Sequence, residues 1–419
     1  MKRALAVLAG LVLLAGLGGL AAYLYKGHLE GNVHGSSTEF NPTQTAPPPP
    51  PPSVKQKIVW PMFAYDMERT HVGPTVPVRP PFRRAWTAGG ASLLEFPPAI
   101  GWNRLFLANG SGHLIAVSTK TGRRAWSYDA RRCQAASPAL ADIGHGTVYE
   151  VFLNRKPCKA KRPGDGEVVA LAVGTGKLRW STHIGASETS PVVVGNRLYV
   201  GDWLGDIRAL DARTGRIIWT TNLGAAVKGA VAVNGDTLYV GAYNGHVYSL
   251  AARNGHVIWR GSADSRLLGS SQFYSTPALA YGRMYIGSTD GKVYSFGATT
   301  GHRIWSYGTG GYVYGSPAVW KQLVLVGSYS HRFYAFDAAT GAVRWTFTAN
   351  GPISGSATVI DGVVYFATLT KGGQTYALSA KTGKLLWTFP DGRYTPVAAD
   401  RRHLYLLGYA KIYAFTPRG

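Results

Sequence analysis

Residues 211–219 read Asp-Ala-Arg-Thr-Gly-Arg-Ile-Ile-Trp, and residues 337–345 carry the close variant Asp-Ala-Ala-Thr-Gly-Ala-Val-Arg-Trp. A Thr-Gly or Asn-Gly pair with Trp four residues after the Gly occurs seven times, and residues 82–86 end a related phrase that lacks the pair. Successive tryptophans of these phrases lie 39 to 54 residues apart. A period in the low forties, with β-branched and aromatic segments, is typical of propeller blades of four antiparallel strands.

Each repeat has the internal pattern of such a blade. A short strand follows a pair such as Ser190-Pro191, turns containing Gly separate the next strands, and Trp lies on the fourth. One blade alone cannot bury an indole ring, so we expect the rings to pack against the neighbouring blade. The predicted structural residues are Trp86, Trp126, Trp180, Trp219, Trp259, Trp305, Trp345 and Trp387.

The two ends of the repeat region predict how the ring closes. The final unit, residues 394–415, has three strands, and the strand that it lacks is supplied by residues 82–86. We therefore predict an all-β, eight-bladed propeller of four-stranded antiparallel blades, closed by an N-terminal strand, because closure removes exposed sheet edges. A seven-bladed ring with a stray strand is the alternative.

The first 58 residues differ in composition from the rest. Residues 4–25 form an apolar run between Lys2-Arg3 and Lys26, long enough to cross a bilayer as a helix. This predicts a signal anchor over residues 1–26 that holds the protein in the cell membrane by a single pass, with the remainder on the extracytoplasmic side. A cleaved signal peptide is the alternative.

Residues 27–58 contain six consecutive prolines at 47–52, which favour an extended polyproline II spacer. We predict a disordered stalk there, with an SH3-type ligand as the alternative. The propeller is predicted to occupy residues 59–419.

The repeated phrase resembles the PQQ-like repeat, the tryptophan-docking motif of the quinoprotein β-propellers, over roughly residues 60–419. Residues 60–63, Trp-Pro-Met-Phe, resemble the entry segment of such proteins. The resemblance implies either a quinone-dependent dehydrogenase, with PQQ and Ca²⁺ on the central axis, or a noncatalytic propeller of the BamB type.

The residues that quinoprotein dehydrogenases use for chemistry are sparse in this sequence. The adjacent cysteine pair of that family is missing, because Cys133 and Cys158 are 25 residues apart. Glu188 is the clearest acid near the start of an inner strand, and we expect Val227, Tyr274 and Tyr314 at the matching positions of neighbouring repeats. One carboxylate beside aromatic residues is a poor site for Ca²⁺, which takes six to eight oxygens.

We therefore expect Glu188 to pair with Lys228 or backbone N–H groups, and we predict no catalytic or metal-binding residue. PQQ with Ca²⁺ is expected only under the dehydrogenase alternative.

The longest repeat interval holds both cysteines and a basic insertion. Loops that enter an inner strand and loops that join the second and third strands emerge on the same face, so we predict a Cys133–Cys158 disulfide, with two buried thiols as the alternative. The net charge is +23, and five of the eight residues at 155–162 are basic. A solvated surface is one interpretation, and binding to an anionic surface is the other. The candidate residues are Arg131, Arg132, Arg155, Lys156, Lys159, Lys161 and Arg162.

These observations favour a noncatalytic interaction module of the cell envelope, whose partners are envelope proteins or anionic envelope polymers. No nucleic-acid ligand is expected, since no groove-reading element is present. The alternative is a PQQ-dependent quinoprotein oxidoreductase.

Overall fold

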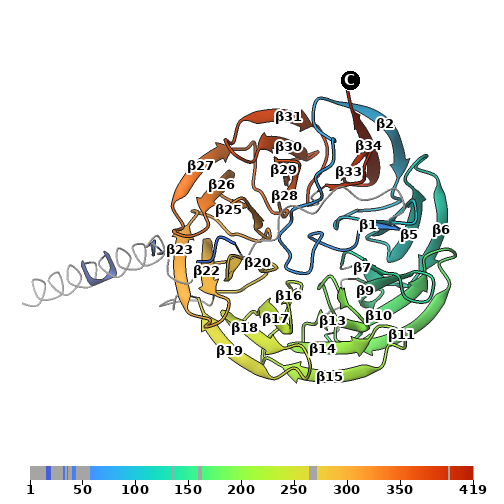
Figure 1. The fold of residues 1–419 in the computed structure, drawn as a ribbon, viewed down its shortest axis with the longest axis horizontal. Coiled ribbons are helices and arrows are strands. Elements are labelled where there is room, and N and C mark those ends of the chain that lie inside the picture. Colours follow the sequence, from blue (N-terminus) through green and yellow to red (C-terminus); the bar gives the residue numbers. More distant parts are fainter. Residues whose placement is uncertain are drawn as a thin grey trace, which may run out of the picture.

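The computed structural model describes residues 16–19, 32–33, 35, 40–43, 57–134, 136–158, 163–263, 271–394 and 397–418. From residue 57 onward these form a ring of eight β-sheets, the blades, around a central axis (Figure 1). Most of the predicted anchor and the proline run lie outside the described residues. Within the described part, no helix is long and apolar enough to span a bilayer.

Blades 1 to 4 are antiparallel sheets in which successive strands lie farther from the axis, except that the first two strands of blade 2 both pair with its third strand. Blade 1 contains β3 (Ala99–Gly101), β4 (Arg104–Ala108), β5 (His113–Ser118) and β6 (Arg124–Asp129), with β1 (Ile58–Trp60) added inside β3. Blade 2 contains β7 (Arg132–Gln134), β8 (Ala139–Ala141), β9 (Thr147–Arg155), β10 (Gly166–Ala172) and β11 (Leu178–Ile184). Blade 3 contains β12 (Val192–Val194), β13 (Arg197–Gly201), β14 (Asp206–Asp211) and β15 (Ile217–Asn222). Blade 4 contains β16 (Ala232–Asn234), β17 (Thr237–Gly241), β18 (His246–Ala251) and β19 (Val257–Ser262).

Blades 5 to 7 repeat the same order, and blade 8 joins the two ends of the ring. Blade 5 contains β20 (Ala278–Ala280), β21 (Arg283–Gly287), β22 (Lys292–Gly297) and β23 (Arg303–Gly308). Blade 6 contains β24 (Ala318–Trp320), β25 (Leu323–Gly327), β26 (Arg332–Asp337) and β27 (Val343–Thr348). Blade 7 contains β28 (Thr358–Ile360), β29 (Val363–Thr368), β30 (Gln374–Ser379) and β31 (Leu385–Phe389). Blade 8 contains β32 (Ala398–Ala399), β33 (Leu404–Leu407), β34 (Lys411–Pro417) and β2 (Phe82–Gly89).

Blade 8 confirms the predicted closure. Its outer strand β2 pairs antiparallel with β34, from Phe82 opposite Pro417 to Gly89 opposite Lys411. In Figure 1 the blue N-terminal strand completes the red C-terminal sheet. The ring therefore has eight blades, and residues 82–89 are not a stray strand.

The tryptophans join each blade to the next. The indole N–H donates to a backbone carbonyl of the following blade at 2.9–3.2 Å for Trp86, Trp126, Trp180, Trp219, Trp259, Trp305 and Trp345. Each of these rings also lies on the Gly of the next Thr-Gly or Asn-Gly pair, where an added Cβ would come within 2.7 Å of an indole carbon. Trp387 packs edge-on against Phe82 of β2, with ring centroids 5.2 Å apart. The Gly and the Trp of the repeat are thus two halves of one contact between blades.

Hydroxyl groups make a second set of contacts between blades, nearer the axis. Backbone N–H groups that precede the inner strands donate to a Ser or Thr hydroxyl of the next blade. The N–H of Thr276, for example, donates to Ser316 Oγ at 3.0 Å. The Ser or Thr before an inner strand therefore accepts a hydrogen bond from the backbone of the neighbouring blade.

A central segment, residues 61–73, runs along the inner edges of the blades and crosses the middle of the ring in Figure 1. Backbone N–H groups on the inner strands of blades 2, 4, 5, 6 and 7 donate to carbonyls of this segment at 2.8–2.9 Å. The buried guanidinium of Arg69 donates to the carbonyls of Phe63, Val231, Ser190 and Pro191. The segment therefore satisfies inner-edge groups that would otherwise lack partners.

Part of the predicted stalk lies against the propeller. The backbone of Val33 exchanges two hydrogen bonds of 3.0 Å with Ser306 of β23, and the Phe40 ring lies 5.0 Å from that of Tyr281. We call residues 32–43 the strap, of which 32–33, 35 and 40–43 are described. Trp305 beneath it is 0 % exposed, whereas the other seven docking tryptophans are half-buried. The strap residues that the structure describes are thus not a free spacer.

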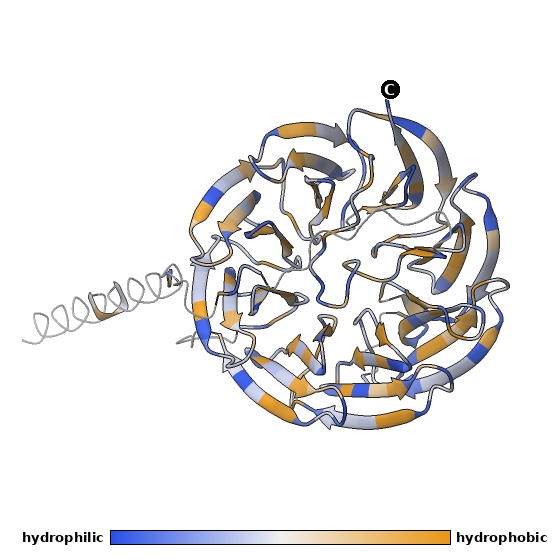
Figure 2. Cartoon of the chain, viewed as in Figure 1, coloured by the Kyte–Doolittle hydropathy of each residue, from blue (hydrophilic) through white to orange (hydrophobic). Residues whose placement is uncertain are grey.

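Figure 2 shows hydrophobic residues in the strands of every blade and also along the outer strands at the rim. Leu178, Ile217, Ile258 and Leu385 on these outer strands are exposed. The cores lie between adjacent sheets.

Candidate functional site

A cavity of about 480 Å³ lies on the axis, on the face where the inner strands begin. Seven of the eight blades contribute to its wall, and Phe63 of the central segment lies at its floor. Six tyrosines line it, namely Tyr243, Tyr274, Tyr312, Tyr314, Tyr329 and Tyr394. Its volume is in the range of ligand-binding pockets.

Seven blades contribute the residue at one equivalent position, four residues before the inner strand begins. Glu95 takes this position in blade 1, Glu188 in blade 3 and Lys228 in blade 4. The others that line the cavity are Tyr274, Tyr314, Ser354 and Tyr394.

The placement of Val227 at this position was wrong by one residue. Lys228 occupies it, while the buried Val227 side chain packs against Gly201. Blade 4 has Ala230-Val231 where blades 2, 3, 5, 6 and 8 carry a Ser/Thr-Pro pair, so the sequence offered no marker for the register.

Lys228 lies in an aromatic box. Its ammonium nitrogen is 4.4 Å from the ring centre of Trp203, 5.1 Å from that of Tyr243 and 5.7 Å from that of Tyr274. It also pairs with Glu188 Oε2 at 3.5 Å. The ion pair expected between these residues is therefore present, and π faces surround the cation.

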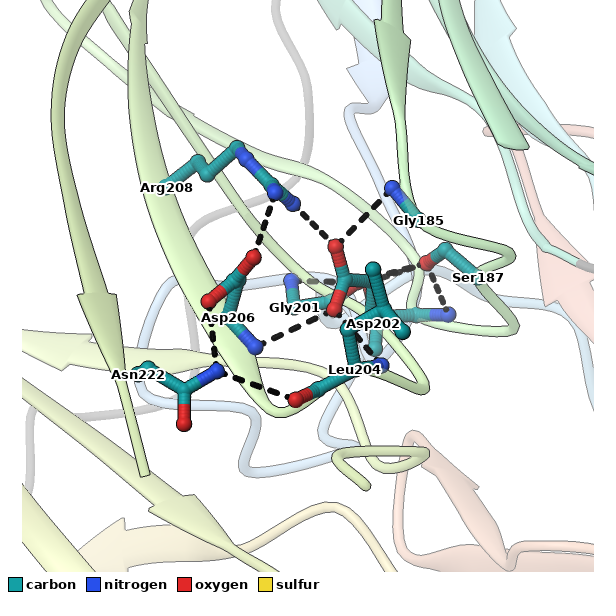
Figure 3. A network of polar contacts seen from close by, with 9 residues as sticks. Gly185, Ser187, Gly201, Asp202, Leu204, Asp206, Arg208 and Asn222 are labelled. Carbon is teal, nitrogen blue, oxygen red and sulfur yellow. Dashed lines mark hydrogen bonds and ion pairs between the residues drawn. The ribbon is translucent and has the colours of Figure 1, made fainter. Parts of the chain in front are cut away.

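The loop that carries Glu188 is held by a polar network in blade 3 (Figure 3). Buried Asp202 accepts hydrogen bonds from the N–H groups of Gly185 and Leu204 and from the Arg208 guanidinium. Ser187, the neighbour of Glu188, donates to the carbonyl of Gly201 at 2.7 Å. Glu188 thus projects from a fixed backbone.

Glu95 differs from Glu188 because no cation faces it in the described part of the chain. The side chain is half-buried at the cavity wall in blade 1. Burial, and after it the charge of Glu188, raises the pKa of the Glu95 carboxyl above its usual range. Burial is also the main cause of the raised pKa of Tyr274, to which both carboxylates add. Among the described residues, the Glu188 carboxylate is therefore paired with a cation and the Glu95 carboxylate is not.

The lining does not fit PQQ with Ca²⁺. The charged residues of the wall are Glu95, Glu188 and Lys228, and Glu188 is already paired with the lysine. Two carboxylates cannot supply the six to eight oxygens that Ca²⁺ takes. Among the described residues no three His, Cys, Asp or Glu side chains are grouped to hold a metal ion. PQQ is itself a carboxylic acid, so the uncompensated Glu95 would repel it.

The predicted disulfide is present on the same face. Cys133 and Cys158 are bonded, with Cα atoms 5.6 Å apart. Cys133 lies in the short strand β7, which pairs with β9, and not in a loop before the inner strand. The bridge encloses a 25-residue stretch and is worth roughly 3–4 kcal/mol on the chain-entropy model.

The basic candidates around this disulfide are not equivalent. Arg131, Arg155 and Lys156 are exposed. Arg132 is only 4 % exposed, because its guanidinium pairs with Glu167 at 2.6 Å and with Asp165 at 3.3 Å, which removes it from the candidate surface. Lys159, Lys161 and Arg162 lie outside the described residues.

A family model described as outer membrane protein assembly factor BamB matches residues 82–202, 204–318 and 308–419. The chain belongs to this family. The match includes both β2 and the C-terminal strand, so it spans the closed ring. No curated protein matches the chain.

Solved structures share the fold with the BamB-family chain at low identity. BamB from Moraxella catarrhalis is 17 % identical, with a TM-score of 0.65 over 80 % of this chain and 99 % of that one. A quinohemoprotein alcohol dehydrogenase from Comamonas testosteroni is 15 % identical, with a TM-score of 0.70 over 86 % and 81 %. A europium-containing methanol dehydrogenase is 13 % identical, with a TM-score of 0.71 over 86 % and 98 %. The fold is thus common to an assembly factor and to dehydrogenases, and the likeness shows the fold alone.

Proposed function

We propose that this BamB-family propeller is a noncatalytic protein-interaction module of the cell envelope, anchored by its N-terminal segment with the propeller on the extracytoplasmic side. The observation that carries the proposal is the lining of the axial cavity. Its carboxylates are too few for Ca²⁺, and one of them is paired with Lys228. The family's description as an assembly factor supports envelope proteins as partners.

The competing function is PQQ-dependent oxidation, and its support is the fold that the chain shares with dehydrogenases. Titration of the purified protein with PQQ and Ca²⁺ separates the two. We expect no stoichiometric quinone absorbance and no reduction of an electron-accepting dye with alcohols, because the cavity lacks the ligand set. Saturable binding together with dye reduction would replace the proposed function with the dehydrogenase.

The exposed basic residues beside the disulfide supply a second contact in this proposal, with anionic lipid or polymer. Arg131, Arg155 and Lys156 lie on the cavity face with exposed side chains, of which Arg155 also forms an ion pair of 3.7 Å with Asp165. Basic side chains near an anionic membrane surface each contribute on the order of 1 kcal/mol.

Charge reversal tests this contact. Changing Arg131, Arg155 and Lys156 to Glu should weaken binding to phosphatidylglycerol vesicles by about tenfold or more, measured by co-sedimentation at low salt. The matched control reverses Arg123, Lys177 and Arg216, which are exposed on Thr-Gly hairpins at the opposite face. Equal losses in the two triple variants would mean that net charge alone governs binding and that the basic residues beside the disulfide form no site.

A further inference from the structure

Negative charge on the axis is unusual in a chain of net charge +23. Glu95 and Glu188 nevertheless occupy equivalent positions on the cavity wall, and Lys228 occupies the same position in blade 4. The three charged side chains of the lining are thus two carboxyl groups and one ammonium group.

The cavity already holds one organic cation of its own. The Lys228 ammonium lies against three π faces and pairs with a carboxylate, and this combination stabilises a desolvated cation. The side of the cavity formed by blades 3 to 5 therefore already binds an ammonium group, that of Lys228.

The side formed by blades 6, 7, 8 and 1 also carries aromatic rings and a carboxyl group, and none of the described lining residues on this side is a cation. Tyr314, Tyr329 and Tyr312 form a continuous aromatic cluster, with the Tyr314 and Tyr329 ring centres 5.1 Å apart and Tyr312 exposed. Tyr394 and Glu95 complete this side of the wall. No residue of the described chain pairs with the Glu95 carboxylate, so a half-buried acceptor and several π faces line a space of about 480 Å³.

We propose that the axial cavity binds an organic cation, an ammonium or guanidinium group that pairs with Glu95 and lies against the tyrosines. The group belongs either to a small amine or to a Lys or Arg side chain of a partner polypeptide. This proposal adds a ligand to the proposed function. It rests on the proposed function in one respect, which is that no quinone occupies the cavity.

Binding to the purified protein is measured by isothermal titration calorimetry, with n-butylammonium and butyrate as probes of equal length and opposite charge. A blocked Gly-Gly-Lys-Gly-Gly peptide forms a third arm. We expect the two cations, but not butyrate, to bind. Tighter binding of the peptide than of n-butylammonium assigns the cavity to a partner side chain, and the reverse assigns it to a small amine. Binding of butyrate alone, or of no probe, would overturn the proposal.

Two variants are expected to change the affinity for n-butylammonium in opposite directions. Glu95→Gln should weaken n-butylammonium binding by about tenfold, because a half-buried charged pair is lost. Lys228→Met should strengthen it, because it removes a like charge and frees Glu188 and the aromatic box. An anion site would respond in the reverse way to Lys228→Met, and that result would exclude a cation site.

The control is Asp236→Asn, which removes the same charge from an exposed turn on the opposite face and should leave binding unchanged. Circular dichroism identifies any variant that fails to fold. If Lys228→Met unfolds, n-butylammonium should raise the melting temperature of Lys228→Ala, and no rise would count against the proposal. If no cation binds, the result of the PQQ titration still stands. The two experiments therefore test the cation site and the noncatalytic function independently.

Discussion

Replacing Trp305 by Ala is expected to lower the free energy of unfolding by roughly 3–5 kcal/mol, as for other fully buried aromatic residues. Its ring is completely buried between Gly341 of blade 6 and the strap, and its N–H donates to the Ala338 carbonyl at 3.0 Å. The substitution leaves a cavity and removes one of the hydrogen bonds that the Ala338 carbonyl accepts, while the Tyr285 hydroxyl still donates to it. Urea unfolding followed by near-ultraviolet circular dichroism measures the loss.

Trp219→Ala is the matched comparison. This ring makes the same contacts with the next blade, a hydrogen bond to Ala252 and packing on Gly255, but it is half-buried, and none of the described strap residues contacts it. We expect a distinctly smaller loss than for Trp305. Equal losses would show that the strap adds nothing to the burial energy of Trp305.

Deleting residues 411–419 is expected to abolish cooperative folding. The deletion removes β34, which pairs with β33 on one side and with β2 on the other. Without it, blade 8 loses its middle strand, the ring stays open, and two strands present unpaired edges that favour aggregation. Size-exclusion chromatography and thermal unfolding should show soluble aggregates without a sharp transition.

Removing only residues 418 and 419 is the control, since both follow the last strand. This shorter deletion should give a monomer with a melting temperature close to that of the intact chain. A monomeric, cooperatively unfolding 411–419 deletion would contradict the role assigned to closure.

The repeat was predictable because the same contact between blades recurs, and both of its partners, the Trp and the Gly, are visible in the sequence. Each Trp requires a Gly on the next blade, so the Thr-Gly…Trp phrase fixed the blade count, and the missing strand after Phe415 located the closure. The strap was not predictable, because residues 32–43 carry no strand periodicity and their partners, Ser306 and Tyr281, lie more than 230 residues away.

The site was predictable only in part. Glu188 and its pairing with Lys228 were expected, and Tyr274 and Tyr314 were placed correctly. Glu95 was missed, because its position is recognisable only when the inner strand of blade 1 is known. Arg132 was misplaced on the surface because the acids that bury it, Asp165 and Glu167, lie beyond the basic insertion in sequence.

The strap also sets how far the propeller reaches from its proposed anchor. Only six peptide units separate Lys26 from Asn32, whose side chain accepts a hydrogen bond from Gly308 at the rim of blade 5. An extended chain of that length spans about 20 Å. With residues 4–25 in a bilayer, this short tether would keep the edge of blade 5 close to the lipid.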